Sequence, residues 1–447
     1  MKKIINFFIN IQKLKEKKRR GWIVHQIKDS ESTASHIFRV AVLSWVLGRK
    51  KRLNIEKVLK IALIHDICEI FTSDETPYDP LLPKKVDSSK NRKKVKEILE
   101  KWPTFTFQQK KEKVRQKAER ELRALRKLIA DLPSDIKSEI EILWQDFEKG
   151  LSREGRFVKQ ADKAENLLQG LEYWEKYGRI QGHLWIRWAR EIFDDPVLIE
   201  FERAIERRFF EKEQGKKEMD RILDFFIDIG KLKTIKREGW VLRKVPNPET
   251  IADHSFSTAL MTWVLKRAEK ISIIKTIKIA LIHKLAKVYI EDFTPYDSIL
   301  PNPREEIKKM IEEPSKFSKE EREKILNQTQ KIYKIWPEFS KKTKEKISKK
   351  EYKTEKKAFQ KVVSGLPQEL GEEMLGLWDQ FKKGLGKEGR FVRQAEKLES
   401  FLQACQYAKE DKNFPIEPWW IEIREKIDDP DLLRFIEALY TKKPFCK

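Results

Sequence analysis

Two histidines and two aspartates in the first half of the sequence have side chains that could bind a metal ion. They are His36, His65, Asp66 and Asp162. Adjacent helical residues point about 100° apart, so His65 and Asp66 cannot grip an ion as an i, i+4 histidine pair does. They could still meet one ion at a helix end if the other two side chains approach from neighbouring helices. Two imidazoles and two carboxylates suit Mn²⁺, Fe²⁺, Co²⁺, Zn²⁺ or, less readily, Mg²⁺. The spacing alone leaves a structural role for the adjacent pair open.

Helical periodicity describes the elements that would position these side chains. NIEKVLKIALIHDICEIF, residues 54–71, has apolar residues at 3.6-residue spacing and an all-apolar centre, which is typical of a buried helix. Another helix is expected to begin near ESTAS, residues 31–35, and residues 155–174 show the same period. Prolines fall between such segments and alternating strand patterns are scarce. The sequence therefore predicts an all-α fold.

The chain carries the same sequence twice. IINFFINIQKLKEKKRRGW at 4–22 aligns with ILDFFIDIGKLKTIKREGW at 222–240, at an offset of 218 residues. Later segments, such as LWQDFEKG and LWDQFKKG, align at an offset of 234 residues. The second copy therefore has 16 additional residues after Pro301, which we expect to form a solvated helical turn or loop.

The repeat predicts two tandem helical bundles, residues 1–212 and residues 213–447. They meet at a polar stretch around Gly215, and each copy has the size of one domain. Two long and divergent copies indicate a tandem duplication.

Composition limits the classes of partner. The 447 residues carry a net charge of +24, which raises the prospect of a polyanionic partner such as nucleic acid. However, the basic residues are interleaved with 72 acids along nearly the whole chain, which favours solvated helix faces. No apolar run approaches the roughly 20 residues that span a bilayer, so no membrane association is expected. Three scattered cysteines are too few for a disulfide framework, and a reducing cytoplasm fits best.

Five motifs of the first copy resemble, in order and spacing, those of the HD-domain phosphohydrolases, and most closely the 5′-deoxynucleotidases among them. They are RRGW, ESTASHIF, IALIHDICEIFTSDETPYD, LWQDFEKG and RFVKQADKAENLL, which span nearly all of residues 5–175. The resemblance implies an all-α bundle with one divalent metal held by a His, a His-Asp doublet and a distant Asp. The matching residues are His36, His65, Asp66 and Asp162. One departure is Ser35, because the residue before the motif histidine is usually acidic in this family.

The resemblance also implies roles for four further residues. Glu69 and Asp74 match acids that could orient a water, accept its proton or protonate the departing sugar oxygen. Arg19 is the candidate for the phosphate, because its forked donors fit two phosphate oxygens. Trp22 could pack on the sugar or could be a core anchor, since Trp240 repeats it in the second copy.

The second copy keeps the histidines but changes the acids. Lys284 aligns with Asp66, Lys287 with Glu69, and Glu396 with Asp162. His254, His283 and Asp292 keep the residue types of their counterparts in the first copy. An ammonium group at a ligand position repels a dication, so no metal is expected there. We expect Lys284 to take the place of the ion, paired with Glu396.

The sequence therefore predicts a metal-dependent enzyme that removes the 5′-phosphate from deoxynucleoside monophosphates or related small nucleotides. Its active site would lie in the first copy only, and the second copy would be a pseudo-enzyme that pairs with the first inside one chain. The alternative is a basic scaffold that binds a nucleotide or nucleic acid without turnover, which the net charge alone favours.

Overall fold

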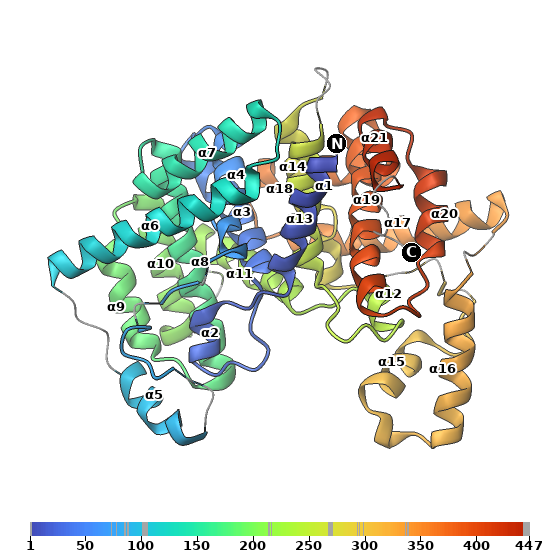
Figure 1. The fold of residues 1–447 in the computed structure, drawn as a ribbon, viewed down its shortest axis with the longest axis horizontal. Helices are drawn as coiled ribbons and strands as arrows, with labels where there is room; N and C mark the ends of the chain where they lie inside the picture. The colour runs from blue at the N-terminus through green and yellow to red at the C-terminus, as the bar shows by residue number, and fades with distance from the viewer. Residues whose placement is uncertain are drawn as a thin grey trace. The chain divides into compact units, whose positions relative to one another are not determined.

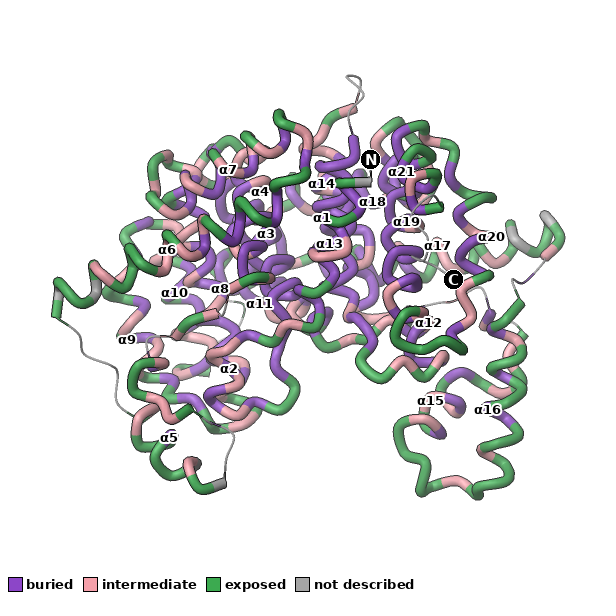
Figure 2. The backbone as a smooth tube through the Cα atoms, in the orientation of Figure 1, coloured by how far each residue is buried: buried purple, intermediate pink, exposed green. Residues whose placement is uncertain are grey.

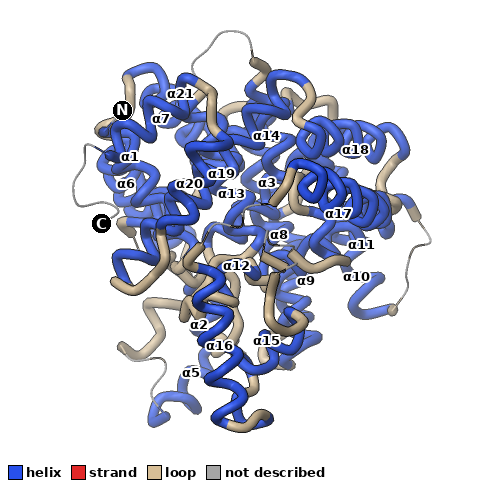
Figure 3. The backbone as a smooth tube through the Cα atoms, turned by 90° about the vertical axis from the view of Figure 1, so that its right-hand side faces the viewer, coloured by secondary structure: helices blue, strands red, loops and turns tan. Residues whose placement is uncertain are grey.

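Helices are the main regular secondary structure of the described residues, and turns and loops connect them. The computed structural model describes residues 2–72, 74–76, 78–84, 86, 89–100, 106–212, 215, 217–266, 271–292, 294, 296–297, 299–335, 337 and 339–440. Within these ranges there is no strand, and two isolated β-bridges join Lys18 to Ser32 and Lys236 to Thr250 (Figure 3). The all-α prediction is confirmed. None of the described helices is long and apolar enough to span a membrane.

The helices form two compact units. The N-terminal unit contains residues 10–230 and 365–367, and the C-terminal unit contains residues 1–9, 231–364 and 368–447. The division into residues 1–212 and 213–447 describes the two sequence copies and, as a division into functional domains, stays a prediction.

The helices are labelled in chain order in Figure 1. The first copy contains α1 (Lys2–Gln12), η1 (Lys13–Lys15), α2 (Arg20–Val24), α3 (Thr33–Lys50), α4 (Ile55–Ile64), η2 (Ile67–Ile70), η3 (Ser89–Asn91), α5 (Arg92–Leu99), α6 (Phe107–Ile129), α7 (Ser134–Lys149), α8 (Arg153–Tyr177), α9 (Gly182–Ile192), α10 (Pro196–Glu206) and η4 (Arg207–Glu211). The second copy contains α11 (Glu218–Gly230), η5 (Lys231–Lys233), α12 (Glu238–Val241), α13 (Ile251–Leu265), α14 (Ile273–Ile282), η6 (Leu285–Val288), α15 (Arg304–Glu312), η7 (Pro314–Lys316), α16 (Lys319–Tyr333), α17 (Lys341–Val363), α18 (Gln368–Lys383), α19 (Gly386–Glu410), α20 (Glu417–Lys426) and α21 (Pro430–Tyr440).

Each unit contains the first helix of the other sequence copy. Residues up to Ile9 of α1 belong to the C-terminal unit, where Phe8 packs edge-on against Phe435 of α21 with ring centroids 6.0 Å apart. Helix α11 belongs to the N-terminal unit, where Phe226 packs edge-on against Phe201 of α10 at 5.7 Å. The apolar faces of α1 and α11, which are equivalent in sequence, thus occupy equivalent positions in their units.

A buried helix lies at the centre of each unit. In the N-terminal unit α3 packs against α4 and α8, and its residues 33–48 are all buried (Figure 2). The Ser32 side chain caps α3 by accepting a hydrogen bond from the backbone N–H of Ser35, which satisfies one of its free N–H groups. In the C-terminal unit α13 packs in the same way against α14 and α19, and all of its residues are buried.

The additional residues of the second copy do not form the solvated turn or loop expected from the sequence. They contribute to α15 and α16, which pack together around a separate core. The buried members of that core are Leu242, Tyr296, Ile307, Met310, Ile325, Leu326 and Tyr333. The apolar side chains of these charged helices pack against residues that are distant in the sequence. The sequence of the insertion alone therefore does not reveal this core.

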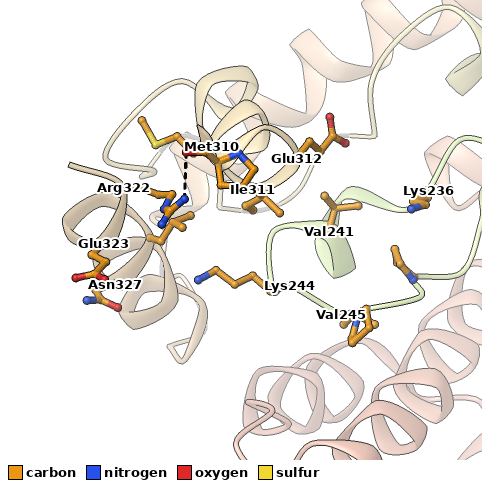
Figure 4. A pocket seen from close by; sticks show the side chains of 14 residues that line it. Lys236, Val241, Lys244, Val245, Met310, Ile311, Glu312, Arg322, Glu323 and Asn327 are labelled. Atoms are coloured by element: carbon orange, nitrogen blue, oxygen red, sulfur yellow. Dashed lines mark hydrogen bonds between the residues drawn. The ribbon is translucent and has the colours of Figure 1, made fainter. Parts of the chain in front are cut away.

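A cavity of about 560 Å³ lies between these helices and the segment that follows η5. Lys244 extends from this segment towards the helix that carries Arg322 and Asn327 (Figure 4). The Arg322 side chain is held by the backbone carbonyl of Pro314 at 3.1 Å.

The described cysteines differ in their bonding. Cys68 is a buried free thiol, whereas Cys405 of α19 takes part in a disulfide bond. A disulfide weakens the argument for a reducing compartment, so the cytoplasmic location stays a prediction.

Candidate functional site

Two of the histidines of the first copy, His36 and His65, face each other from α3 and from the end of α4. The Nε2 atoms of His36 and His65 lie 3.4 Å apart, and both rings are buried. Helix α4 ends at His65 because Asp66, at φ −111° and ψ 10°, leaves the helical conformation. This change of direction brings the Asp66 carboxylate to the same point as the imidazole before it.

Hydrogen bonds on the far side of each ring fix which nitrogen faces the centre. Nδ1 of His65 donates to the carbonyl of Ala62 at 2.8 Å, and Nδ1 of His36 contacts the carboxylate of Glu165. Both Nε2 atoms are then directed to the common centre, and a metal ion requires their lone pairs there. Arg39 in turn donates to Glu165 at 2.8 Å.

The two aspartates complete a set of four side chains around one point. Oδ2 of Asp66 lies 3.4 Å from Nε2 of His65, and Oδ1 of Asp162 on α8 lies 3.1 Å from Nε2 of His36. Ligands held at about 2.1 Å from an ion lie about 3.0 to 3.4 Å from one another. The ligand atoms of His36, His65 and Asp66 all lie within 4.8 Å of one another, so these three could hold an ion. Oδ1 of Asp162 lies 4.0 Å from Nε2 of His65. The structure therefore brings together all four residues predicted to hold the ion.

The charges of the site also suit a cation. Burial alone would raise the pKa of Asp66, but His65 and Arg19 lower it well below its ordinary value. Burial likewise opposes ionisation of Asp162, and Lys163 and His36 overcome it and lower its pKa. Both aspartates are therefore anionic, the form that ligates metal. Without an ion, the pKa of His36 is raised to about 9, because Glu165 and Asp162 outweigh burial and Arg19, which lower it, so a metal must displace the proton from this imidazole to bind it.

The Arg19 guanidinium lies beside the acidic side chains of the site. Its Nη1 donates to Asp66 at 2.6 Å and its Nη2 donates to the side chain of Asn166 at 3.0 Å. Its Nε lies 3.8 Å from Asp74. A guanidinium that reaches the metal-binding carboxylates is also within reach of an anion bound to the same centre.

Glu69 and Asp74 lie beside the same centre. Burial, followed by the charges of Asp74 and Asp66, raises the pKa of Glu69 well above its ordinary value. The hydroxyl of Thr33 donates to Glu69 at 3.1 Å. Asp74 accepts a hydrogen bond from the backbone N–H of Arg20 at 2.9 Å. Burial and the neighbouring carboxylates therefore favour the protonated form of Glu69.

Trp22 is packed in the core of its unit. Only 2% of its surface is exposed, and its indole N–H donates to Glu31 at 2.8 Å. Its ring stacks on Trp185 at 5.4 Å and meets Tyr173 edge-on at 5.1 Å. These contacts favour the core-anchor interpretation over packing on a sugar.

Several residues that serve the site were not singled out from the sequence. Asn166 donates to Asp162 at 3.0 Å, and Glu165 holds His36. Both lie within the quoted segment ADKAEN, at the i+3 and i+4 positions that share a helix face with Asp162. Lys117 of α6 interacts electrostatically with Asp66 and Glu69. Helix α6 packs against η2, a contact that no local sequence signal predicts. Lys163 also donates to Asp162, at 2.8 Å.

The second copy retains the histidine pair and replaces the acids by ion pairs. The Nε2 atoms of His254 and His283 lie 3.3 Å apart. Nζ of Lys284 lies 2.9 Å from Glu396, and Nζ of Lys287 lies 2.9 Å from Glu355 of α17.

Asp292 lies closest to cations other than Lys284. Its carboxylate lies 3.8 Å from Lys287 and 3.9 Å from Arg237. Among the described residues of this site, Lys284 is therefore paired with Glu396, while Asp292 lies nearest to the other two cations.

Comparisons with known proteins identify the family to which the chain is similar. The sequence matches the HD domain family over residues 11–183, 229–350 and 342–427. It is 30% identical over 183 residues to the 5′-deoxynucleotidase HDDC2 of Xenopus laevis, covering 40% of this chain and 75% of the relative. It is 30% identical over 199 residues to the 5′-deoxynucleotidase HDDC2 of Dictyostelium discoideum, covering 43% of this chain and 80% of the relative. A solved structure of a conserved hypothetical protein from Pyrococcus furiosus is 25% identical, with a TM-score of 0.33, over 49% of this chain and 99% of that chain.

Proposed function

From the finding that this chain belongs to the HD domain family and is a phosphohydrolase resembling the 5′-deoxynucleotidases, we propose that its first copy removes the 5′-phosphate from deoxynucleoside monophosphates or related small nucleotides. The observation that carries this proposal is the convergence of His36, His65, Asp66 and Asp162, whose facing ligand atoms lie 3.1 to 4.0 Å apart. These four residues would hold one divalent ion, with Mn²⁺, Co²⁺, Fe²⁺, Zn²⁺ and Mg²⁺ as candidates.

The bound ion would supply a water of lowered pKa and withdraw charge from a phosphate oxygen. The chain supplies the proton transfers and the anchoring of the substrate. Glu69 accepts the proton of the water as its oxygen forms a bond to phosphorus. As the phosphorus–oxygen bond to the sugar breaks, the sugar oxygen takes up a proton, and Asp74 would relay to it the proton that Glu69 accepted from the water.

Arg19 would exchange its contact with Asp66 for the phosphate. In the structure its forked donors reach Asp66 and Asn166 at 2.6 and 3.0 Å. A dication neutralises the aspartates and frees the guanidinium, whose two parallel donors fit two phosphate oxygens. Arg19 is in this way available to orient the substrate only when the ligand set is filled.

The second copy would not hydrolyse substrate. Lys284 and Lys287 stand in place of a metal ligand and of the proton acceptor, and both are paired with carboxylates. We expect no metal at this site. The pairing of the two copies as an internal dimer-like assembly is part of the proposal, as is a substrate that is a small nucleotide rather than nucleic acid.

Phosphate release tests this function. A panel of nucleoside and deoxynucleoside monophosphates is incubated with the full chain and Mn²⁺, Co²⁺ or Mg²⁺, and inorganic phosphate is measured. Asp66→Ala should abolish release, whereas Lys284→Ala should leave it. If Lys284→Ala abolished phosphate release and Asp66→Ala retained it, the active site would lie in the second copy and the proposal would be wrong. Salt-sensitive polyanion binding without turnover would favour the basic-scaffold alternative.

A further inference from the structure

The C-terminal unit retains a cavity at the position that corresponds to the candidate active site of the first copy. Its volume is about 120 Å³. Its lining includes Arg237, Lys284 and Asp292, the counterparts of Arg19, Asp66 and Asp74. The space is small compared with the roughly 300 Å³ or more of pockets that enclose a whole ligand. It suits one compact polar group.

The charged groups around this cavity do not cancel within the described residues. Four basic side chains line it, together with three acids, Asp292, Glu396 and Glu422. Glu396 is paired with Lys284 at 2.9 Å, Glu422 with Lys397 at 3.0 Å, and Asp292 lies 3.9 Å from Arg237. Arg237 is also paired with Glu249 at 3.1 Å, and Asp292 lies 3.8 Å from Lys287. Among the described residues that line the cavity, Arg243 is the basic side chain without a carboxylate within 4.0 Å.

Arg243 has an unusual environment for a guanidinium. Its group lies 4.3 Å from the ring centres of both Trp419 and Tyr333, and 5.1 Å from that of Tyr296. Its Nη1 donates to the carbonyl of Gly239 at 2.8 Å, and no carboxylate lies within 4.0 Å of it among the residues that the structure describes. Its Nε is buried without a hydrogen-bond partner there. The rings hold the group in place while donors remain available.

This positive charge is a feature of the second copy. The aligned residue of the first copy is His25, which is buried and neutral because burial lowers its pKa to about 4. Burial also lowers the pKa of Arg243, to about 10, so that it stays charged at neutral pH. The first site has carboxylates that need a cation, whereas the second has a cation that needs an anion.

We propose that the cavity of the second copy binds a phosphate group, with Arg243 and Lys284 as its cationic donors and Trp419 as its wall. A tetrahedral oxyanion fits the volume and takes up the forked donors of Arg243 as well as the remaining donors of Lys284. Because the Lys284 ammonium is paired with Glu396 beside His254 and His283, where an ion would otherwise bind, the group binds there and is not hydrolysed. The source of the group is free phosphate or the ester phosphate of a small nucleotide.

Calorimetric titration of the full chain with inorganic phosphate tests this site. A chelator first removes metal, so that the carboxylates of the first copy repel the anion and hydrolysis plays no part in the readout. Arg243→His introduces the residue that the first copy has at this position. Arg434→His on α21 is the matched control, because Arg434 is exposed and does not line the cavity.

Phosphate should bind the wild type and Arg434→His alike and should bind Arg243→His at least roughly tenfold more weakly, as expected on loss of a charge-assisted hydrogen bond. Arg243→Lys keeps the charge but loses the fork, so it should bind several-fold more weakly than the wild type. If Arg243→His lowers the midpoint of thermal unfolding, the phosphate affinity of Arg243→Lys tests the proposal instead. Absence of binding at millimolar phosphate, or equal affinity in all variants, would overturn the proposal.

The source of the phosphate group is distinguished by competition. Tighter binding of deoxyadenosine 5′-monophosphate than of free phosphate identifies an ester phosphate, and equal binding identifies free phosphate. Deoxyadenosine without a phosphate should not compete, and competition by this nucleoside would contradict a phosphate site. Failure of these titrations leaves the hydrolysis assay of the first copy unaffected, so the two proposals can fail separately.

Discussion

Nζ of Lys284 lies 2.9 Å from Oε1 of Glu396, so the second copy places an ammonium against an acid where the first copy has the aspartates 66 and 162. Under the proposed function, a cation is built into the chain at this site and comes from solution at the other. This pair explains why the same helical segment occurs twice with its charge reversed.

Restoring one acid should not restore hydrolysis in the second copy. In a chain that carries Asp66→Ala, the additional change Lys284→Asp should leave phosphate release at background, because Lys287 still occupies the position of Glu69 and is paired with Glu355. Phosphate release is measured with Mn²⁺ in excess. Recovery of activity in this double variant would show that the pseudo-enzyme assignment is wrong.

Glu69→Gln should reduce turnover without loss of metal. The amide cannot accept the proton of the attacking water, so kcat should fall by roughly 10²- to 10⁴-fold while Mn²⁺ affinity changes little. The control is Glu75→Gln, since Glu75 is exposed and pairs with Arg120. A reduction of less than threefold in Glu69→Gln would exclude Glu69 as the proton acceptor.

Trp22→Phe should act on stability rather than on substrate binding. The change removes the indole N–H from Glu31 and leaves a buried acceptor without this donor, which costs about 1–3 kcal/mol. Trp240→Phe is the matched variant, because the Trp240 indole donates to Glu249 at 2.9 Å and stacks on Trp419. Chemical denaturation measures both. A large rise in KM for Trp22→Phe at unchanged stability would instead support contact with the sugar.

His25 should make the protein less stable in acid. Its folded-state pKa of about 4 lies below the ordinary 6.5, so the unfolded chain takes up the proton first as the pH falls. The neutral ring contributes fully above pH 6.5, and its contribution falls between pH 6.5 and 4 by at most about 3 kcal/mol. Relative to wild type, His25→Asn should lose this part of the pH dependence, whereas His183→Asn on the exposed face of α9 should not. Identical pH profiles for wild type and His25→Asn would contradict this.

The sequence was sufficient for the helical class, because helical periodicity is a local pattern. The candidate ligand set came from the resemblance to the HD-domain phosphohydrolases, and its role in metal binding stays a prediction. His65 and Asp66 end a helix whose period is visible, and the i+3 and i+4 neighbours of Asp162 follow from helix geometry. The stacking of Trp22 on Trp185 depends on tertiary packing between distant segments, which no local pattern reports.

The placement of the first helices was beyond sequence reasoning for a different reason. Helices α1 and α11 have almost the same apolar face, with Phe8 and Phe226 at equivalent positions. Either helix would suit either unit by its own pattern, so the observed membership follows from the assembled structure alone.

The most direct measurement is the number of Mn²⁺ ions bound per chain, determined by equilibrium dialysis and metal analysis. We predict one ion for the wild type, none for Asp66→Ala and one for Glu396→Gln. Two ions in the wild type, or an ion retained in Asp66→Ala and lost in Glu396→Gln, would contradict a single metal centre formed by His36, His65, Asp66 and Asp162.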